Sequence, residues 1–237
     1  MPQQDAAPAW GAAGPPPVLI LAGGRGSRLR PLLADRPKVL APLGGRPFLA
    51  HLLDRLAGSG LERVVLCTGH LGDQVARAVG PCWGPLEVHC AREERPLGTA
   101  GALPPAARHA PGADLLVLNG DSWVEADLAR FVAWCRERSG PAAMVLARVE
   151  DPSRYGSVEI DSAGRVQGFA EKQENPAGPA WINAGIYLFR RRLLESLPPR
   201  RPLSLEREVL PDLVGRELWG WAGGREFIDI GTPASYR

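Results

Sequence analysis

The stretch LILAGGRGSRLRPLLADRPKVLAPL, Leu19–Leu43, places an apolar run before a glycine-rich turn and a tail of cations and prolines. The apolar run predicts a buried strand, and the three glycines between residues 23 and 26 predict a tight turn at its carboxyl end, where open α/β sheets bind ligands. Glycines let backbone N–H groups approach an anion closely. Arg28 and Lys38 follow the turn, so the stretch predicts a triphosphate site rather than a plain surface loop.

Two common phosphate-binding motifs are not met here. A Walker loop requires GxxxxGK followed by Ser or Thr, and the dinucleotide fingerprint requires a third glycine where this chain has Leu29. The glycine-rich turn therefore predicts an anion site of another class.

The composition limits the classes of protein to which the chain can belong. The 237 residues are 45% hydrophobic and 23% charged, which predicts one α/β domain over residues 17–237 behind a mobile Ala/Pro/Gly-rich leader, residues 1–16. A net charge of +2 gives no reason to expect a nucleic-acid or membrane partner. No apolar run approaches the roughly 20 residues that span a bilayer, and four irregularly spaced cysteines fit neither a disulfide framework nor a zinc site. We expect a cytoplasmic protein with reduced thiols.

Apolar runs and helical spacing alternate along the first half of the chain. This alternation predicts βαβ units and a largely parallel sheet. The predicted strands are Val18–Leu21, Arg63–Thr68, Leu86–Cys90 and Leu115–Leu118, and the predicted helices are Pro47–Ala57, Gly72–Val79, Thr99–Arg108 and Leu128–Arg138. After Ala142 the pattern predicts a mixed or antiparallel extension, with strands Met144–Val149, Ser157–Ile160, Val166–Glu171, Ile182–Phe189 and Glu226–Ile230 and a helix Leu205–Val214.

Two separated motifs carry a resemblance to a known family. LAGGRGSRLRP (Leu21–Pro31) with PKVLAP (Pro37–Pro42) resembles the signature of the sugar-1-phosphate nucleotidyltransferases. The resemblance continues through EERPLGTAGAL (Glu93–Leu103), LNGD (Leu118–Asp121), YGSVE (Tyr155–Glu159), FAEK (Phe169–Lys172), NAGIYLF (Asn183–Phe189), SLEREVLP (Ser204–Pro211) and FIDIGTPASY (Phe227–Tyr236). It implies a Rossmann-like three-layer α/β fold with a mixed, mostly parallel sheet, and transfer of a nucleotidyl group from a nucleoside triphosphate to a sugar 1-phosphate with release of pyrophosphate.

Two acids stand at the ends of predicted strands, Asp121 after LLVLN and Asp229 in FIDIG. A lone acid there would be read as a helix cap. Joining two phosphates requires a cation between them, and Mg²⁺ is typically held by one or two carboxylates together with phosphate oxygens. By resemblance, Asp121 and Asp229 are the ligands of this Mg²⁺.

Further site residues follow from the resemblance alone. Arg28 and Lys38 would stabilise the departing pyrophosphate. Lys172 would hold the attacking sugar phosphate, Glu171 and Asn183 would bind sugar hydroxyls, and Gly156 would let the backbone approach the sugar. The alternatives are a solvated charge pair for Glu171 and Lys172 and a turn residue for Asn183. The expected nucleotide site contains Leu21, Ala22, Gly23, Gly24, Gly26, Glu93, Gly98 and Thr99.

Glu93 bears on the choice of base. An ionised carboxylate only accepts hydrogen bonds, and guanine offers it two adjacent donors, N1–H and N2–H₂. This favours GTP, unless Glu93 belongs to a solvated charged run, AREER, and the backbone of Gly98 selects the base.

Subfamily features favour one acceptor sugar. The chain stops at Arg237, so we expect no appended β-helix domain. PLGTAG and FIDIGTPxxY look most like the D-glycero-D-manno-heptose 1-phosphate guanylyltransferases. The alternatives are a muramate or hexose 1-phosphate uridylyltransferase or guanylyltransferase, or a catalytically silent nucleotide-sugar sensor. The sugar itself and the oligomeric state, including a homo-oligomer, stay open at this point.

Overall fold

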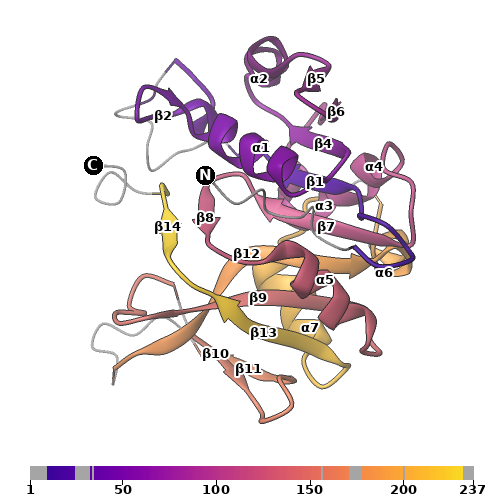
Figure 1. The fold of residues 1–237 in the computed structure, drawn as a ribbon, viewed down its shortest axis with the longest axis vertical. Coiled ribbons are helices and arrows are strands. Elements are labelled where there is room, and N and C mark those ends of the chain that lie inside the picture. The colour runs from indigo at the N-terminus through magenta and orange to yellow at the C-terminus, as the bar shows by residue number, and fades with distance from the viewer. Residues whose placement is uncertain are drawn as a thin grey trace, which may run out of the picture.

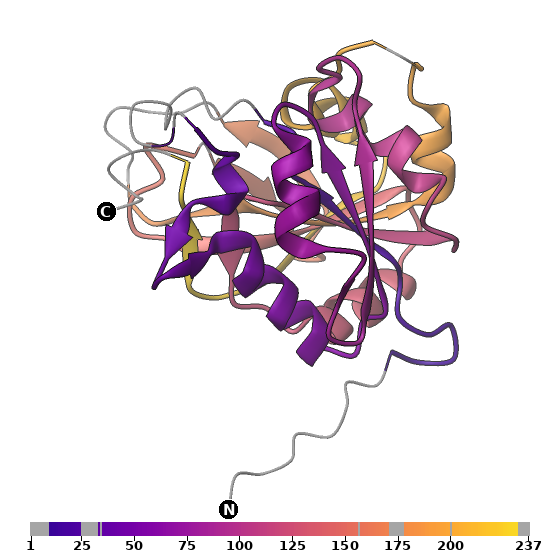
Figure 2. The same ribbon diagram turned by 90° about the horizontal axis from the view of Figure 1, so that it is seen from above.

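A mixed β-sheet forms the centre of the protein, between two layers of helices (Figures 1 and 2). The computed structural model describes residues 10–24, 33, 35–155, 157–170, 178–199 and 201–231. Within them the central sheet has eight strands, in the spatial order β13 (Leu218–Gly224), β9 (Ala142–Val149), β12 (Ala180–Arg190), β7 (Asp114–Asn119), β1 (Val18–Leu21), β4 (Arg63–Thr68), β6 (Leu86–Arg92) and β5 (Cys82–Trp83).

Four strands of the sheet, β7, β1, β4 and β6, run parallel. Their residues are largely apolar because helices cover both faces: Ile20 packs into the core on one face and Leu19 into the core on the other. Parallel strands bring their carboxyl ends to the same edge of the sheet. The turn after β1 and the loops after β4, β6 and β7 therefore meet there, which is where the sequence predicts the ligand site.

The second half of the chain continues the sheet beyond β7. β12 runs antiparallel to both β7 and β9, and β13 runs parallel to β9, so the predicted mixed extension is confirmed. Three short two-stranded pairs complete the β-structure: β2 (Pro42–Leu43) with β3 (Arg46–Pro47), β8 (Ser122–Val124) with β14 (Phe227–Asp229), and β10 (Ser157–Ile160) with β11 (Val166–Ala170).

The helices divide between the two faces of the sheet. The core on one face is closed by α1 (Phe48–Gly58), α2 (Gly72–Val79) and α5 (Leu128–Arg136). The other face packs against α3 (Gly98–Gly101), α4 (Leu103–Ala107), α6 (Arg191–Ser196), the π-helix η2 (Leu205–Val209) and α7 (Leu210–Leu213). A short 3₁₀ helix, η1 (Lys38–Leu40), precedes β2. The architecture agrees with the predicted three-layer α/β fold.

Three details differ from the elements predicted by the sequence. The helix predicted over Thr99–Arg108 is two short helices, with Pro104 and Pro105 in the first turn of the second. The helix predicted over Leu205–Val214 is a π turn followed by α7. Strand β13 was not predicted, because three of its seven residues are glycines. They permit close packing: a Cβ on Gly224 would lie 2.6 Å from the carbonyl oxygen of Leu146 in β9.

The expected mobile leader is corrected for residues 10–16. Trp10 is buried in the core and its indole Nε1 donates a hydrogen bond to the Ser59 carbonyl oxygen at 3.0 Å. Arg136 on α5 donates to the carbonyl oxygens of Trp10 and Gly14, at 2.7 and 2.9 Å. A buried indole and two charge-assisted bonds hold this segment on the domain.

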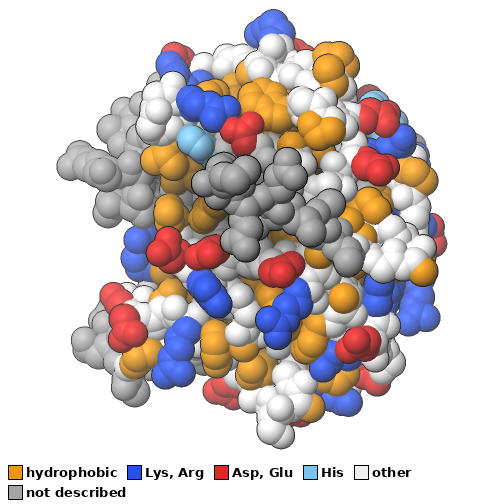
Figure 3. All heavy atoms as spheres, viewed as in Figure 1, with side chains coloured by type: hydrophobic (Ala, Val, Ile, Leu, Met, Phe, Trp, Pro, Cys, Tyr) orange, Lys and Arg blue, Asp and Glu red, His pale blue; other side chains and the backbone are white. Residues whose placement is uncertain are grey.

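The surface carries both signs of charge. On the face seen in Figure 3, Lys and Arg side chains are interspersed with Asp and Glu. Among the described residues, none of the helices combines the length and the apolar character that crossing a membrane would require.

Candidate active site

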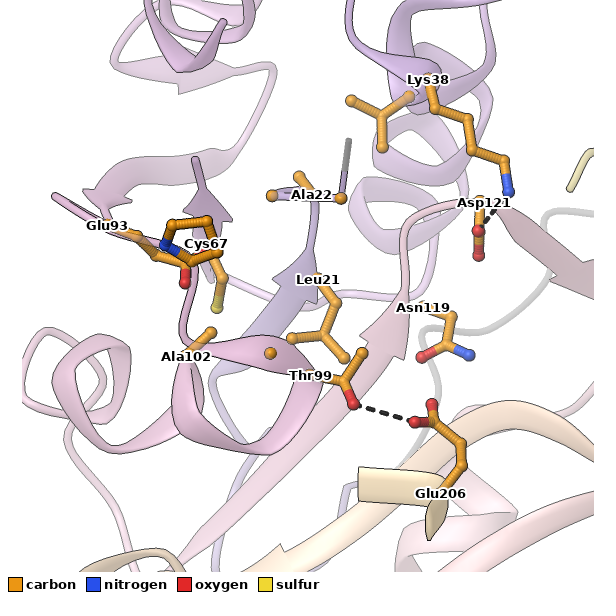
Figure 4. A pocket seen from close by; sticks show the side chains of 15 residues that line it. Leu21, Ala22, Lys38, Cys67, Glu93, Thr99, Ala102, Asn119, Asp121 and Glu206 are labelled. Atoms are coloured by element: carbon orange, nitrogen blue, oxygen red, sulfur yellow. Dashed lines mark hydrogen bonds and ion pairs between the residues drawn. The ribbon is translucent and has the colours of Figure 1, made fainter. Parts of the chain in front are cut away.

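Two adjoining cavities lie at the carboxyl ends of the parallel strands. The first has a volume of about 300 Å³, and Figure 4 shows the side chains around it. Its walls come from the turn after β1, from η1, β4 and β7, from the loop that follows β6 with α3, and from η2. The lining residues are Leu21, Ala22, Gly23, Gly24, Lys38, Val39, Cys67, Glu93, Pro96, Gly98, Thr99, Ala102, Asn119, Asp121 and Glu206.

The second cavity is larger, about 700 Å³, and lies beside the β8–β14 pair and β12. The residues that line it include Ser122, Arg154, Asn183, Tyr187, Arg207 and Asp229. Asn119, Asp121 and Glu206 line both cavities. The two cavities therefore adjoin at these three residues.

The glycine turn forms one wall of the smaller cavity. The N–H of Ala22 donates to the Cys67 carbonyl oxygen at 2.9 Å, which ties the turn to β4. A Cβ on Gly23 would lie 2.4 Å from Glu93 Oε1, whereas a Cβ on Gly24 would meet nothing within 4 Å. A side chain at residue 23 would thus displace the Glu93 carboxylate, and Gly24 leaves the backbone open toward the cavity.

Glu93 is turned into the cavity rather than out to solvent. Its Oε2 accepts a hydrogen bond from the Leu97 N–H at 2.6 Å. Burial raises the pKa of the half-buried carboxyl group, and the bond from Leu97 opposes that rise. The alternative of a freely solvated charged run does not describe this side chain. Burial also raises the pKa of the neighbouring Cys67 thiol to about 12, so that thiol is neutral at physiological pH.

Gly98 and Thr99 fasten the loop after β6 onto η2. Gly98 has φ +73°, and a Cβ there would lie 2.5 Å from the Leu203 carbonyl oxygen. The Thr99 hydroxyl donates to Glu206 Oε2 at 2.9 Å and accepts from the Leu205 N–H at 2.8 Å (Figure 4). The Thr99 side chain, expected to bind nucleotide, lines the cavity while its hydroxyl is engaged by η2.

Lys38 and Asp121 form an ion pair where the two cavities meet. Lys38 Nζ lies 2.5 Å from Asp121 Oδ2, and the Lys38 side chain is 15% exposed (Figure 4). Asp121 follows β7 after one glycine and leads directly into β8, so it is not a helix cap.

Asp229 reaches the same place from the neighbouring strand. Residues Ser122 and Asp229 pair across the β8–β14 ladder, and the Ile230 N–H donates to the Asp121 carbonyl oxygen at 3.0 Å. Asp229 Oδ1 accepts from the Gly231 N–H at 2.6 Å, and Oδ2 lies 3.5 Å from Arg154 Nη2.

This pair of acids fits the needs of Mg²⁺. Asp121 and Asp229 both line the larger cavity, and Mg²⁺ uses one or two protein carboxylates while phosphates and waters fill its other positions. The part of the chain that the structure describes contains no group of three or more His, Cys, Asp or Glu able to hold a metal. A site that relies on substrate oxygens is consistent with that finding.

Asn183 lines the larger cavity from β12, in a constrained setting. Its Nδ2 donates to the Tyr187 hydroxyl at 2.9 Å, and its Oδ1 accepts from the Gly185 N–H at 3.0 Å. Burial raises the pKa of the Tyr187 phenol well above its usual range. Asn183 therefore lies within strand β12, at an irregularity in its pairing with β9, and not in a turn.

Five expected site residues lie outside the described residues: Gly26, Arg28, Gly156, Glu171 and Lys172. The other expected residues line one or both cavities.

The structure also adds residues to which the sequence assigned no role, namely Asn119, Arg154 and Glu206. Asn119 and Glu206 belong to the motifs LNGD and SLEREVLP. The motifs therefore indicated that these residues lie near the site, but they could not predict where either side chain points.

The chain has relatives among curated proteins. The mannose-1-phosphate guanylyltransferase of Mycobacterium tuberculosis is 37% identical over 230 residues, which cover 92% of this chain and 62% of that enzyme. The chain thus spans about 62% of the length of this relative. The D-glycero-alpha-D-manno-heptose 1-phosphate guanylyltransferase of Aneurinibacillus thermoaerophilus is 30% identical over 221 residues, with 93% and 95% of the two chains covered.

Solved structures share the fold. The crystal structure of HddC from Yersinia pseudotuberculosis complexed with GMP-PN superposes with a TM-score of 0.82 at 30% identity, over 94% of this chain and 96% of that one. Residues 17–237 match the family model described as Nucleotidyl transferase. The chain therefore belongs to the nucleotidyl transferase family.

Proposed function

We propose that residues 17–237 form one domain that transfers a guanylyl group from GTP to a manno-configured sugar 1-phosphate, releasing pyrophosphate. The observation that carries this proposal is the pair of adjoining cavities that meet at Asp121. A two-substrate reaction needs two neighbouring sites, with a carboxylate at the point where the substrates touch. Both curated relatives described above are guanylyltransferases.

The nucleotide occupies the smaller cavity. Its phosphates lie along the open backbone at Gly24, where N–H groups can reach them, and its base lies toward Glu93. Glu93 Oε1 accepts from the N–H groups of guanine, while Leu97 holds Oε2 in place. A carboxylate cannot pair with the N1 acceptor of adenine, so ATP is the poorest substrate.

The sugar 1-phosphate occupies the larger cavity, with Asn183 at a sugar hydroxyl and Lys172, Glu171 and Gly156 completing the site by resemblance. A phosphate oxygen of the sugar attacks the α-phosphorus, and the bond from that phosphorus to the oxygen bridging it to the β-phosphate breaks. Pyrophosphate leaves with that oxygen. No side-chain nucleophile is needed, so the protein contributes mainly position and charge.

Charge stabilisation falls to the residues around Asp121. Asp121 and Asp229 would hold Mg²⁺, which when bound offsets the repulsion between the two phosphates. Lys38, already beside Asp121, can turn to the departing pyrophosphate, and Arg28 is assigned there too by resemblance. We place this reaction in the cytoplasm, in keeping with four cysteines that are all free.

Pyrophosphate release over a grid of triphosphates and sugar 1-phosphates tests the proposal. GTP with mannose 1-phosphate or D-glycero-D-manno-heptose 1-phosphate should give the highest kcat/KM, since the relatives act on these two sugars. GTP that binds without pyrophosphate release from any pair would identify a silent sensor instead. A highest rate with UTP would refute the guanylyl assignment.

A further inference from the structure

One buried polar atom lies unpaired where the two cavities join. Among the described residues, Asn119 Oδ1 is the buried side-chain oxygen or nitrogen with no hydrogen-bond partner. Buried polar atoms in folded proteins nearly always have a partner. Asn119 lines both cavities, so the missing partner can be a ligand rather than a protein group.

The surroundings fix which end of the Asn119 amide is free. The Asn119 side chain is hydrogen-bonded to the Tyr187 hydroxyl, and this bond lowers the pKa of the phenol against the larger rise caused by burial. A Cβ at residue 185, where glycine has φ +77°, would lie 2.9 Å from Asn119 Nδ2. The nitrogen thus faces Tyr187 and Gly185, and the oxygen is left as an acceptor without a donor.

A second acceptor approaches from η2. Glu206 Oε2 takes hydrogen bonds from the Thr99 hydroxyl at 2.9 Å and the Ser204 hydroxyl at 3.3 Å, and no described residue bonds to Oε1. Glu206 also lines both cavities, and Figure 4 shows its carboxylate pointing toward the Asn119 amide. Thr99 and Ser204 therefore hold a carboxylate that has one oxygen to offer.

Two acceptors without a partner among the described residues, Asn119 Oδ1 and Glu206 Oε1, favour a ligand group that donates hydrogen bonds. The phosphates of both substrates are themselves acceptors, and the N–H groups of the base lie toward Glu93, at another part of the smaller cavity. The substrate groups that remain near Asp121 and can donate are the hydroxyls of the ribose and of the sugar ring.

We propose that Asn119 Oδ1 and Glu206 Oε1 together bind substrate hydroxyls at the junction of the cavities and make the enzyme require them. The inference rests on the proposed function, because it assumes that a nucleotide and a sugar 1-phosphate meet there. The hydroxyls belong either to the ribose or to the acceptor sugar, and deoxy analogues of each distinguish the two sources.

The test compares kcat/KM for each parent substrate and its complete set of monodeoxy analogues, in wild type, Asn119→Leu and Glu206→Gln. In the wild type, kcat/KM should be at least about tenfold lower with one of the analogues than with the parent substrate. A site built to bind a hydroxyl rejects the ligand that lacks it. In Asn119→Leu the parent and that analogue should become nearly equal. Asn119→Asp, which keeps an acceptor, should retain a clear preference.

Equilibrium binding separates this inference from the proposed function. Titration calorimetry with GTP and its 2′- and 3′-deoxy forms, and with the sugar 1-phosphate and its deoxy forms, needs no turnover. Wild type that binds with the expected preference but releases no pyrophosphate would refute the function and keep the inference. Indifference of wild type to every deoxy analogue, or an unchanged preference in both Asn119→Leu and Glu206→Gln, would overturn the inference.

Discussion

Replacing Gly23 with alanine tests whether the glycine turn holds in place the carboxylate of Glu93, which we propose contacts the base. The added Cβ would lie 2.4 Å from Glu93 Oε1 and 3.2 Å from the Gly69 nitrogen. The first distance is about 1 Å inside a normal van der Waals contact, so the carboxylate must swing away and lose its 2.6 Å bond from Leu97. A hydrogen bond to a charged group contributes about 1.5–3 kcal/mol, and partial exposure of Glu93 reduces this to about 1–2 kcal/mol.

The expected result is a lower melting temperature. In a domain of this size about 1 kcal/mol corresponds to roughly 2–4 °C, so Gly23→Ala should lower Tm by about 2–8 °C in scanning calorimetry. Gly24→Ala is the matched control, because its Cβ meets nothing within 4 Å and its Tm should stay near that of wild type.

A double-mutant cycle identifies the cause. With Glu93→Ala in the background, the clash with Oε1 is gone and Gly23→Ala should cost much less. An equal loss of Tm in both backgrounds would refute the argument that Glu93 is the group displaced, and so would an equal loss in Gly24→Ala.

Four further substitutions test the proposed chemistry. Asp121→Asn and Asp229→Asn should each reduce Mg²⁺-dependent turnover by at least about a hundredfold while the circular dichroism spectrum is kept, and near-normal kinetics at saturating Mg²⁺ would remove that residue from the metal site. Lys172→Ala should raise KM for the sugar 1-phosphate far more than for GTP, because a point charge on the acceptor phosphate is lost; equal effects on both substrates would contradict its assignment. Glu93→Gln should weaken the preference for GTP over ATP in kcat/KM. Since burial raises the pKa of Glu93, the wild-type preference should fade as the pH falls through that raised pKa, and a preference that the variant shares at every pH would exclude Glu93 from base recognition.

Much of the fold could be predicted because local patterns and tertiary structure agree. The bounds predicted for Val18–Leu21, Arg63–Thr68 and Gly72–Val79 match β1, β4 and α2, each of which has a clear apolar pattern. No strand was predicted over Leu218–Gly224, because three of its residues are glycines, yet this segment is β13, and Gly224 packs closely against β9. The burial of Trp10 could not be predicted either, because its hydrogen-bond partners Ser59 and Arg136 are distant in the sequence.

The site was predictable where motifs mark it, and not where side-chain direction decides. The motifs mark three residues: Lys38, which begins η1, Asp121, which follows β7, and Asp229, which ends β14 beside β8. Lys38 and Asp121 form an ion pair, and Asp121 and Asp229 line one cavity. Glu206 looks in the sequence like one of several charges on an exposed helix. Its role depends on η2 lying against α3, a contact between residues more than a hundred positions apart that no local pattern encodes.

The two cavities share Asn119, Asp121 and Glu206, and this has a consequence for the product. A nucleotide sugar made here would occupy both cavities as one molecule, so its two halves bind with the effective concentration of a tethered pair rather than as independent ligands. Such a ligand would dissociate more slowly than either substrate. We therefore expect release of the product, rather than bond formation, to limit the rate. The accumulating nucleotide sugar would then compete with both GTP and the sugar 1-phosphate, and thereby restrain its own synthesis.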